Sequence, residues 1–161
     1  MVKIPLTQGR EAIIDNEDYE LVSKYKWHYA DYLNGRGYAK TNNHGKRPRL
    51  LRMHRLIMQA EPGEKIDHIS MDTLDNRKSN LRRVNQSQNM MNSGLRNTNK
   101  SGFKGVCYLN RSELKSKWLA TIWKDGKQIN LGCHKTKEEA ALAYNKAAKG
   151  LHGEFARLNI I

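Results

Sequence analysis

Short apolar runs separated by polar turns make up the first 60 residues of the chain. Runs at 2–6 and 12–14 come before the segment DNEDYELVSKYKW, whose acidic start and spaced apolar side chains predict a short helix. Aromatic residues on both sides of a glycine-containing turn at 35–37 predict a hairpin. A further apolar segment, RLLRMHRLIM, ends before a Pro-Gly break. The pattern therefore predicts several short strands and helices.

The next region, KIDHISMDTLDNRKSNLRRVNQSQNMMN, is polar and rich in asparagine. Its apolar positions predict a strand at 65–69, a polar loop at 70–81, a second strand at 82–84 and a short helix at 85–92. The predicted unit is thus a strand, a loop, a strand and a helix.

Alternation of apolar and polar positions returns after residue 102. Runs at 103–109, 117–123 and 128–133 predict three antiparallel strands, and the sequence KDGK between the last two is a strong hairpin signal. Thr136 and Glu139 form a capping box that begins a helix. The apolar stripe of this helix is rich in alanine, which favours close packing on the sheet.

The segment SGLRNTNKSG separates these two regions and has the composition of a flexible connector. We therefore predict an α+β protein with domains at 1–95 and 102–161 and a linker at 96–101. In the second domain, one helix is expected to pack on a three-stranded antiparallel sheet.

Composition adds a strong positive charge to this picture. The 161 residues carry a formal net charge of +13, and the mean hydropathy is −0.83. A chain this basic is expected to bind a polyanion, and both predicted domains are net positive. The sequence has no apolar core of a signal peptide at its start and no apolar run long enough for a membrane span, which predicts a cytoplasmic protein without membrane contact.

Asp67 and His68 place a carboxyl group next to an imidazole in the asparagine-rich region. A neutral histidine can accept a proton from water near neutral pH, and carboxylate and amide oxygens suit Mg²⁺ or Mn²⁺. Such groups match the needs of phosphodiester hydrolysis, namely an activated water and a cation that stabilises the leaving oxygen. Taken alone, however, an acid–histidine pair is more often a polar surface pair or part of a turn.

The motifs DH, DNR, NLR and QNMMN in this region resemble the HNH nucleases, specifically the homing-endonuclease branch that ends in asparagine. The resemblance covers nearly all of the first predicted domain and implies a ββα-metal fold. It implies that His68 is the general base and that Asp67 and Asn89 hold one Mg²⁺ or Mn²⁺ ion. It also implies that Asn80 holds His68 in position and that His54 supports the reaction near the phosphate.

Zinc is not expected at this site. Asparagine stands at the last position of the motif where other HNH nucleases have histidine, and Cys107 and Cys133 are isolated from each other in the sequence. The family resemblance implies products with 5′-phosphate and 3′-hydroxyl ends.

The segments FKGV, KWLATI, LGCHKTKEEAALAYNKAA and GEFARLNI resemble the APETALA2/ethylene-response-factor DNA-binding domain over residues 101–160. The resemblance implies that three strands backed by one helix enter the major groove of DNA. Lys104 stands where plant domains usually have an arginine that reads DNA. Cys107, Trp123, Gln128 and Asn130 depart from the plant pattern, so a plant target sequence does not transfer.

The residues predicted to contact DNA are basic side chains of both domains and polar or aromatic side chains on the outer face of the second sheet. They are Arg49, Arg52, Arg55, Arg77, Arg82, Arg83, Lys104, Lys117, Trp123, Gln128 and Asn130.

These observations predict a metal-dependent endonuclease of phage or bacterial homing type that cuts double-stranded DNA, as a monomer or weak dimer, in the host cytoplasm. One site per chain favours nicking unless two chains cooperate. A DNA-binding regulator with an inactive nuclease fold is the alternative, and a small basic RNA-binding protein is a third. An exposed aromatic surface for single strands would need more aromatic residues than the 7% present.

Overall fold

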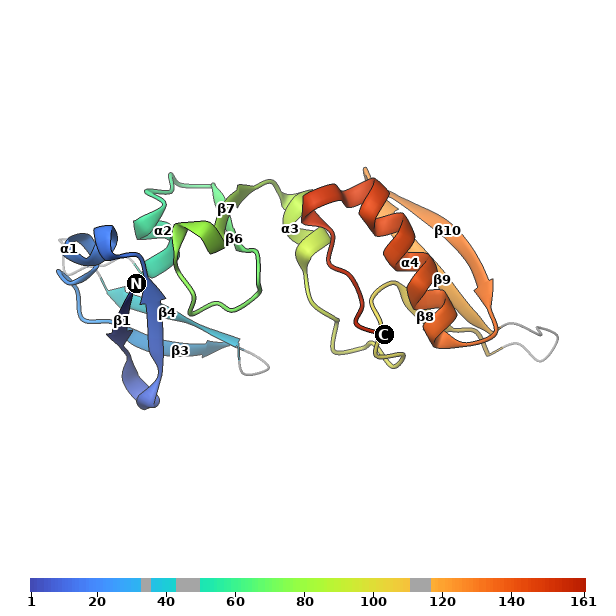
Figure 1. Ribbon diagram of the computed structural model, residues 1–161, viewed down its shortest axis with the longest axis horizontal. Coiled ribbons are helices and arrows are strands. Elements are labelled where there is room, and N and C mark those ends of the chain that lie inside the picture. The colour runs from blue at the N-terminus through green and yellow to red at the C-terminus, as the bar shows by residue number, and fades with distance from the viewer. Residues whose placement is uncertain (33–35, 43–49, 111–116) are drawn as a thin grey trace. The chain divides into compact units, whose positions relative to one another are not determined.

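The computed structural model describes residues 1–161 except 33–35, 43–49 and 111–116 (Figure 1). The chain forms two compact units, Met1–Asn85 and Gln86–Ile161. Both units combine small antiparallel sheets with short helices, in agreement with the predicted mixed class. Among the described residues, no helix combines the length and the apolar character that crossing a bilayer requires.

In its described residues, the first unit contains three small sheets, two short α-helices and several single-turn 3-10 helices. Its strands pair as β1 with β2, as β3 with β4 with β5, and as β6 with β7. The bounds are β1 Val2–Pro5, β2 Glu11–Ile14, α1 Tyr19–Val22, β3 His28–Tyr32, β4 Arg36–Asn42, β5 Leu50–Arg52, α2 Met53–Ile57, β6 Lys65–His68 and β7 Leu81–Val84.

One apolar cluster joins these pieces. Ile14 from β2, Val22 from α1 and Met53 from α2 are completely buried together. Trp27 packs against them and donates a hydrogen bond from Nε1 to the carbonyl of Val22 (2.8 Å), which satisfies the last turn of α1. The predicted short helix and the predicted hairpin are confirmed. The turn does not lie at 35–37 as predicted, because Arg36 and Gly37 already pair with β3 as residues of β4, and position 35 lies outside the described residues.

The β6–β7 pair carries the asparagine-rich loop between its two strands. In its antiparallel register Asp67 faces Arg82, and His68 faces Leu81. The loop is fixed to β2, because the amide of Asn76 donates to the carbonyl of Ile13 at 2.7 Å. The first hairpin of the chain therefore supports the loop that follows His68.

The second unit begins with a helix and continues into a sheet with a long helix on one face (Figure 1). The sheet order is β10-β9-β8, as expected for three antiparallel strands. The bounds are α3 Gln86–Asn92, β8 Val106–Tyr108, β9 Trp118–Lys124, β10 Lys127–His134 and α4 Lys137–His152.

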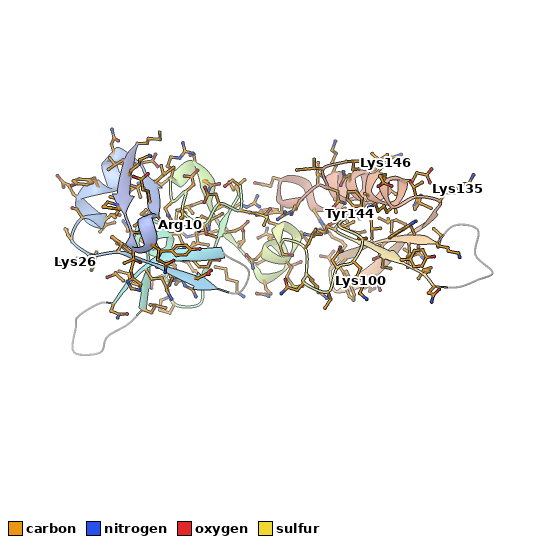
Figure 2. The ribbon with its side chains drawn as sticks, turned by 90° about the horizontal axis from the view of Figure 1, so that it is seen from below. Arg10, Lys26, Lys100, Lys135, Tyr144 and Lys146 are labelled. Atoms are coloured by element: carbon orange, nitrogen blue, oxygen red, sulfur yellow. The ribbon has the colours of Figure 1, made fainter. Side chains whose placement is uncertain are left out.

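The predicted hairpin and capping box of this unit are confirmed. Asp125 and Gly126 connect β9 to β10 with positive φ angles of 49° and 75°, as a tight turn requires. Thr136 accepts from the amide of Glu139 at 3.1 Å, and the Glu139 carboxylate accepts from the Thr136 amide. In Figure 2, Tyr144 points from α4 toward the sheet, where it is buried.

Gly105 lies where the chain passes under Tyr144. A Cβ atom at this position would lie 2.1 Å from the Tyr144 ring, and the φ angle of 74° is one that side-chain-bearing residues rarely adopt. The glycine of the FKGV segment is therefore required by the approach of α4 to the sheet.

The helix that follows β7 belongs to the second compact unit, which begins at Gln86. The predicted linker at 96–101 therefore lies inside this unit. The assignment of 1–95 and 102–161 as separate domains stays a prediction.

Candidate active site

His68 is the last residue of β6 and is only 5% exposed. Its ring packs edge-on against His54 from α2, with 5.0 Å between the ring centroids. Tyr38 from β4 completes the cluster, at 5.3 Å from His54 and 6.0 Å from His68. Three elements thus bring the predicted base and the predicted supporting histidine together with a tyrosine that the sequence did not single out.

Asn76 contacts one edge of the His68 ring. Its Oδ1 is 3.4 Å from His68 Nε2, and the Asn76 side chain is 1% exposed. Asn76 Nδ2 donates to the carbonyl of Leu74 at 3.0 Å, which leaves Oδ1 directed at the imidazole. Sequence reasoning quoted the DNR motif but gave Asn76 no role, although a buried asparagine next to a catalytic motif is a usable signal.

Asn80 fixes the loop directly after His68. Its Oδ1 accepts from the amide of Ser70 at 2.9 Å, and its Nδ2 donates to the carbonyl of Asp75 at 2.8 Å. Its own carbonyl accepts from the amide of Ile69, also at 2.9 Å. Asn80 therefore connects the start and the end of the loop, an arrangement compatible with the role predicted for it.

Burial keeps both imidazoles of the cluster neutral. Desolvation lowers the pKa of His54 to about 3, and the neighbouring His68, Arg52 and Arg55 add to this effect. Desolvation also lowers the pKa of His68, whereas its hydrogen bond to Asn76 and the nearby carboxylates raise this pKa. At neutral pH the ring of His68 is available to accept a proton.

Asp67 forms an ion pair with the residue opposite it on β7. Arg82 donates from Nε and Nη2 to Asp67 Oδ2 at 3.1 and 3.0 Å, and both side chains are about a tenth exposed. Such a pair is well shielded from water. The predicted metal ligand therefore has an arginine partner.

The donor set fits a hard divalent cation in part. Within the described ranges, no cluster of three or more His, Cys, Asp or Glu side chains could hold a metal by itself. Magnesium commonly uses only one or two protein oxygen ligands, and takes the rest from water and substrate phosphates. The shielded carboxylate of Asp67 meets that requirement, whereas Asn89 lies on α3 in the second unit and is half-buried there.

The arginines predicted to contact DNA in the first unit have partners within it. Arg55 donates to the carbonyls of Ala60, Glu61 and Glu64, so it closes the turn after α2. Arg83 donates to the carbonyl of Met58 at 2.6 Å.

Arg77 forms a two-pronged ion pair with Asp75, at 2.8 and 2.6 Å, and lowers the pKa of that carboxyl group. Arg52 lies over the ring of Tyr38, 5.4 Å from its centroid. Arg49 lies outside the described residues. Contact of these arginines with DNA stays a prediction.

The outer face of the second sheet gathers the side chains that were expected there. Trp123 is 59% exposed and faces Gln128 across the β9–β10 pair. Asn130 faces Thr121 in the same pair and accepts a hydrogen bond from the amide of Gly132 at 2.8 Å, where the register shifts. Lys117 precedes β9 and is half-buried.

Lys104 differs from this group, since its ammonium group donates to backbone carbonyls inside the second unit. Its contact with DNA stays a prediction.

Comparisons with known proteins identify the family of the segment that carries these residues. A family model described as HNH endonuclease matches residues 52–91, which include His54, Asp67, His68, Asn76, Asn80 and Asn89. An uncharacterized HNH endonuclease of Acanthamoeba polyphaga mimivirus is 32% identical over 160 residues, 96% of this chain and 77% of that protein. The chain belongs to the HNH endonuclease family. It is accordingly a nuclease, and the family implies a DNA substrate.

Two further relatives match parts of this HNH endonuclease. Protein 3.8 of Escherichia phage T7 is 34% identical over 95 residues, 59% of this chain and 75% of the phage protein. Dehydration-responsive element-binding protein 2A of Arabidopsis thaliana is 38% identical over 72 residues, but these are 44% of this chain and 20% of the plant protein. No solved structure matches the chain.

Proposed function

We propose that this HNH endonuclease cuts double-stranded DNA in a reaction that depends on Mg²⁺ or Mn²⁺ and uses His68 as the general base. The observation that carries the proposal is the buried, neutral ring of His68, directed by Asn76 and adjacent to the carboxylate of Asp67. A protected imidazole next to an oxygen ligand provides both groups that phosphodiester hydrolysis needs.

The hydrogen bond to Asn76 sets the direction of proton transfer. When His68 Nε2 donates to Asn76 Oδ1, the proton-accepting lone pair of the ring is on Nδ1. His68 Nδ1 takes the proton of the attacking water, and Asn76 stabilises the imidazolium that results. Asn80 keeps the loop in place during this step.

Asp67 and Asn89 are the residues that would hold the ion, with Asp67 supplying the negative charge. When bound, the ion polarises the phosphate and stabilises the leaving 3′ oxygen, so the products carry 5′-phosphate and 3′-hydroxyl ends. His54 packs against His68, and Arg52 lies over the ring of Tyr38, which belongs to the same cluster; Arg52 would provide a cation for the phosphate.

The second unit is proposed to bind the major groove through its outer sheet face, in the manner of an APETALA2-like domain. The exposure of Trp123 opposite Gln128 supports this role, since a β-sheet reads base edges with the side chains of one face. The name of the Arabidopsis relative, an element-binding protein, agrees with it. A nuclease unit joined to its own DNA-binding unit is the organisation expected of a homing endonuclease.

The test is incubation of the purified protein with supercoiled plasmid, with and without Mg²⁺. We expect conversion to open circle only with the ion. His68→Ala should reduce the rate about 10²–10⁴-fold, the usual effect of losing a general base, and should leave DNA affinity unchanged.

The matched control is His28→Ala, which removes an imidazole from β3 outside the cluster and should keep the parent rate. Full activity of His68→Ala would eliminate the proposed base. Tight DNA binding without cutting under any divalent ion would favour the regulator instead.

A further inference from the structure

The side chain of Arg52 reaches the ring of Tyr38 because of the register between β4 and β5. Arg52 is the last residue of β5 and faces Lys40 of β4. Tyr38 comes two residues before Lys40, so it projects from the same face of the sheet and is a diagonal neighbour of Arg52. Long side chains can bridge such a diagonal, and the guanidinium carbon of Arg52 is 5.4 Å from the centre of the Tyr38 ring. Two adjacent strands thus bring a cation over an aromatic face.

Electrostatics favours this placement of the guanidinium group. Lys40 carries the same charge directly opposite Arg52, and like charges at opposite positions of a strand pair repel each other. The face of an aromatic ring instead attracts a cation that lies within about 6 Å of its centre. A planar guanidinium group can also stack on such a face, which an ammonium group cannot do. The contact with Tyr38 therefore restricts the direction in which Arg52 points.

The ring of Tyr38 also lies beside both imidazoles of the cluster. Its centroid is 5.3 Å from that of His54 and 6.0 Å from that of His68. Arg52 is close enough to His54 to contribute to the lowering of the pKa of that histidine. Because both imidazoles are neutral at neutral pH, they do not repel Arg52, and the guanidinium group can remain next to the proposed base.

The backbone at Tyr38 is held from two directions. Its strand, β4, is the central strand of the sheet, with β3 on one side and β5 on the other. The carbonyl of the preceding Gly37 accepts a hydrogen bond from Thr73, in the loop that follows His68. The same loop contains Asn76, which contacts the His68 ring. The position of the Tyr38 ring is therefore coupled to the loop that directs the proposed base.

We propose that Tyr38 is a positioning residue for the nuclease reaction: its ring holds the guanidinium group of Arg52 at the histidine cluster, where this group contacts the phosphate of the bond to be cut. The inference rests on the proposed role of Arg52 as the cation for the phosphate. Arg52 and Tyr38 are both half-buried, so part of each side chain remains accessible from solvent. A guanidinium group that lies over a ring can still donate hydrogen bonds from its edge to phosphate oxygens.

The test is a double-mutant cycle on the rate at which the full chain cuts supercoiled plasmid with Mg²⁺, at protein concentrations that saturate the DNA. The four proteins are the parent, Tyr38→Leu, Arg52→Gln and the double variant. Tyr38→Leu keeps an apolar side chain but removes the aromatic face, and we expect it to cut about tenfold more slowly than the parent. A tenfold change corresponds to about 1.4 kcal/mol, which lies within the range of a shielded cation–π contact.

The decisive measurement is the effect of Tyr38→Leu when Arg52 is already absent. If the ring acts by holding Arg52, the double variant should cut less than about twofold more slowly than Arg52→Gln. Tyr38→Phe keeps an aromatic face and should recover most of the rate that Tyr38→Leu loses. Should Tyr38→Leu fail to fold, Tyr38→Met takes its place in the cycle, since a methionine side chain adapts to an irregular space.

Arg10→Gln is the matched control. Arg10 is exposed (Figure 2) and also lies over a tyrosine ring of the first unit, 5.2 Å from the centre of Tyr29, but that ring is not part of the histidine cluster. The control removes one arginine from an aromatic face elsewhere and should cut at the parent rate.

Two results would overturn the inference while leaving the proposed function intact. Equal slowing by Tyr38→Leu in the presence and absence of Arg52 would show that the ring acts through the histidines or through packing alone. Parent-like cutting by Tyr38→Leu would show that Arg52 does not need the ring.

A failure of the proposed role of Arg52 would overturn the inference in a different way. Arg52→Gln would then cut at the parent rate, and its binding to duplex DNA without metal would keep the salt dependence of the parent. Loss of one phosphate contact should instead lower the slope of log affinity against log salt by about 0.9.

Discussion

The buried ring of His54 influences the protonation of the neighbouring His68. Its ring is 4% exposed and packs between Tyr38 and His68, with two arginines close enough to disfavour its protonation. A charged ring at this place would repel both arginines and any proton on His68. Neutrality of His54 is therefore part of what keeps His68 able to act as a base.

The burial of His54 predicts a loss of stability in acid. Its pKa is about 3 in the folded chain and 6.5 in an unfolded one, so below pH 6.5 the unfolded state binds a proton that the folded state does not. The contribution of neutral, buried His54 to the free energy of unfolding is complete above pH 6.5 and is lost as the pH falls toward 3. Each pKa unit is worth about 1.4 kcal/mol, which makes the effect several kcal/mol in total.

Urea unfolding at pH 7 and pH 4.5 tests this expectation. The parent should lose more stability between these two pH values than His54→Gln, which keeps a polar side chain but cannot be protonated. The remaining pH dependence of the variant should come partly from His68, whose pKa is lowered as well. An equal loss in both proteins would show that His54 is protonated in the folded state.

At the level of elements, the β6–β7 pair joins a proposed metal ligand to an arginine. The variant Arg82→Met removes the arginine partner of the Asp67 carboxylate. Removing one partner of a buried ion pair typically lowers the free energy of unfolding by about 3–5 kcal/mol. The double variant Asp67→Asn/Arg82→Met removes both charges and should recover most of that loss. Thermal unfolding in EDTA measures these differences.

The same variants report on the metal. In Arg82→Met, Mn²⁺ should raise the unfolding temperature more than in the parent, because the ion no longer shares Asp67 with an arginine. The double variant should show no such gain, since its site lacks the negative charge. Equal stabilisation of all three proteins by Mn²⁺ would remove Asp67 from the metal site.

The sequence predicted the bounds of these strands and of the helix well. It did not predict which residues bind the arginine side chains. The strands 65–69 and 82–84 and the helix 85–92 agree with β6, β7 and α3 to within one residue at each end, because apolar spacing reports local structure directly. The partner of each arginine depends on residues far apart in the chain. The sequence therefore did not predict that loop carbonyls bind Arg55 and that Asp75 binds Arg77, and the contact of both arginines with DNA stays a prediction.

At the level of the whole molecule, a net charge of +13 predicts binding to DNA that depends strongly on salt. Lys117→Ala should lower the slope of log affinity against log salt by about 0.9 if this lysine neutralises one phosphate. Gln128→Ala should leave the slope unchanged and alter only the preferred sequence, because an amide reads base edges without releasing a counterion.

Selection from a random duplex library at two salt concentrations separates these effects. Cys133→Ser, on the same sheet face, serves as a control for a neutral change. Unchanged salt dependence and unchanged sequence preference in both Lys117→Ala and Gln128→Ala would remove the outer sheet face from the DNA contact.

The sequence did not predict that α3 belongs to the second compact unit. The polar connector SGLRNTNKSG suggested that the second unit starts near residue 102, since composition marks a linker only where the chain makes few contacts. In the structure, Asn99 instead donates from its side chain to the carbonyl of Phe103 at 2.8 Å and accepts from the amide of Gly102. These local hydrogen bonds order a segment whose composition is that of a flexible one.

Because α3 belongs to the second unit, the point at which two related genes recombine decides whether the helix keeps the side chains that support it. A recombination event within codons 96–101 would join a new recognition module to a helix that has lost Lys104, which binds the carbonyls at its end, and Asn159, which binds the backbone of Lys104, whereas a crossover near codon 86 would transfer the helix together with its supports. Chimeric nucleases made at the second joint should therefore inherit Asn89 from the donor of the DNA-binding unit. In such a chimera, His68 comes from one parent and Asn89 comes from the other.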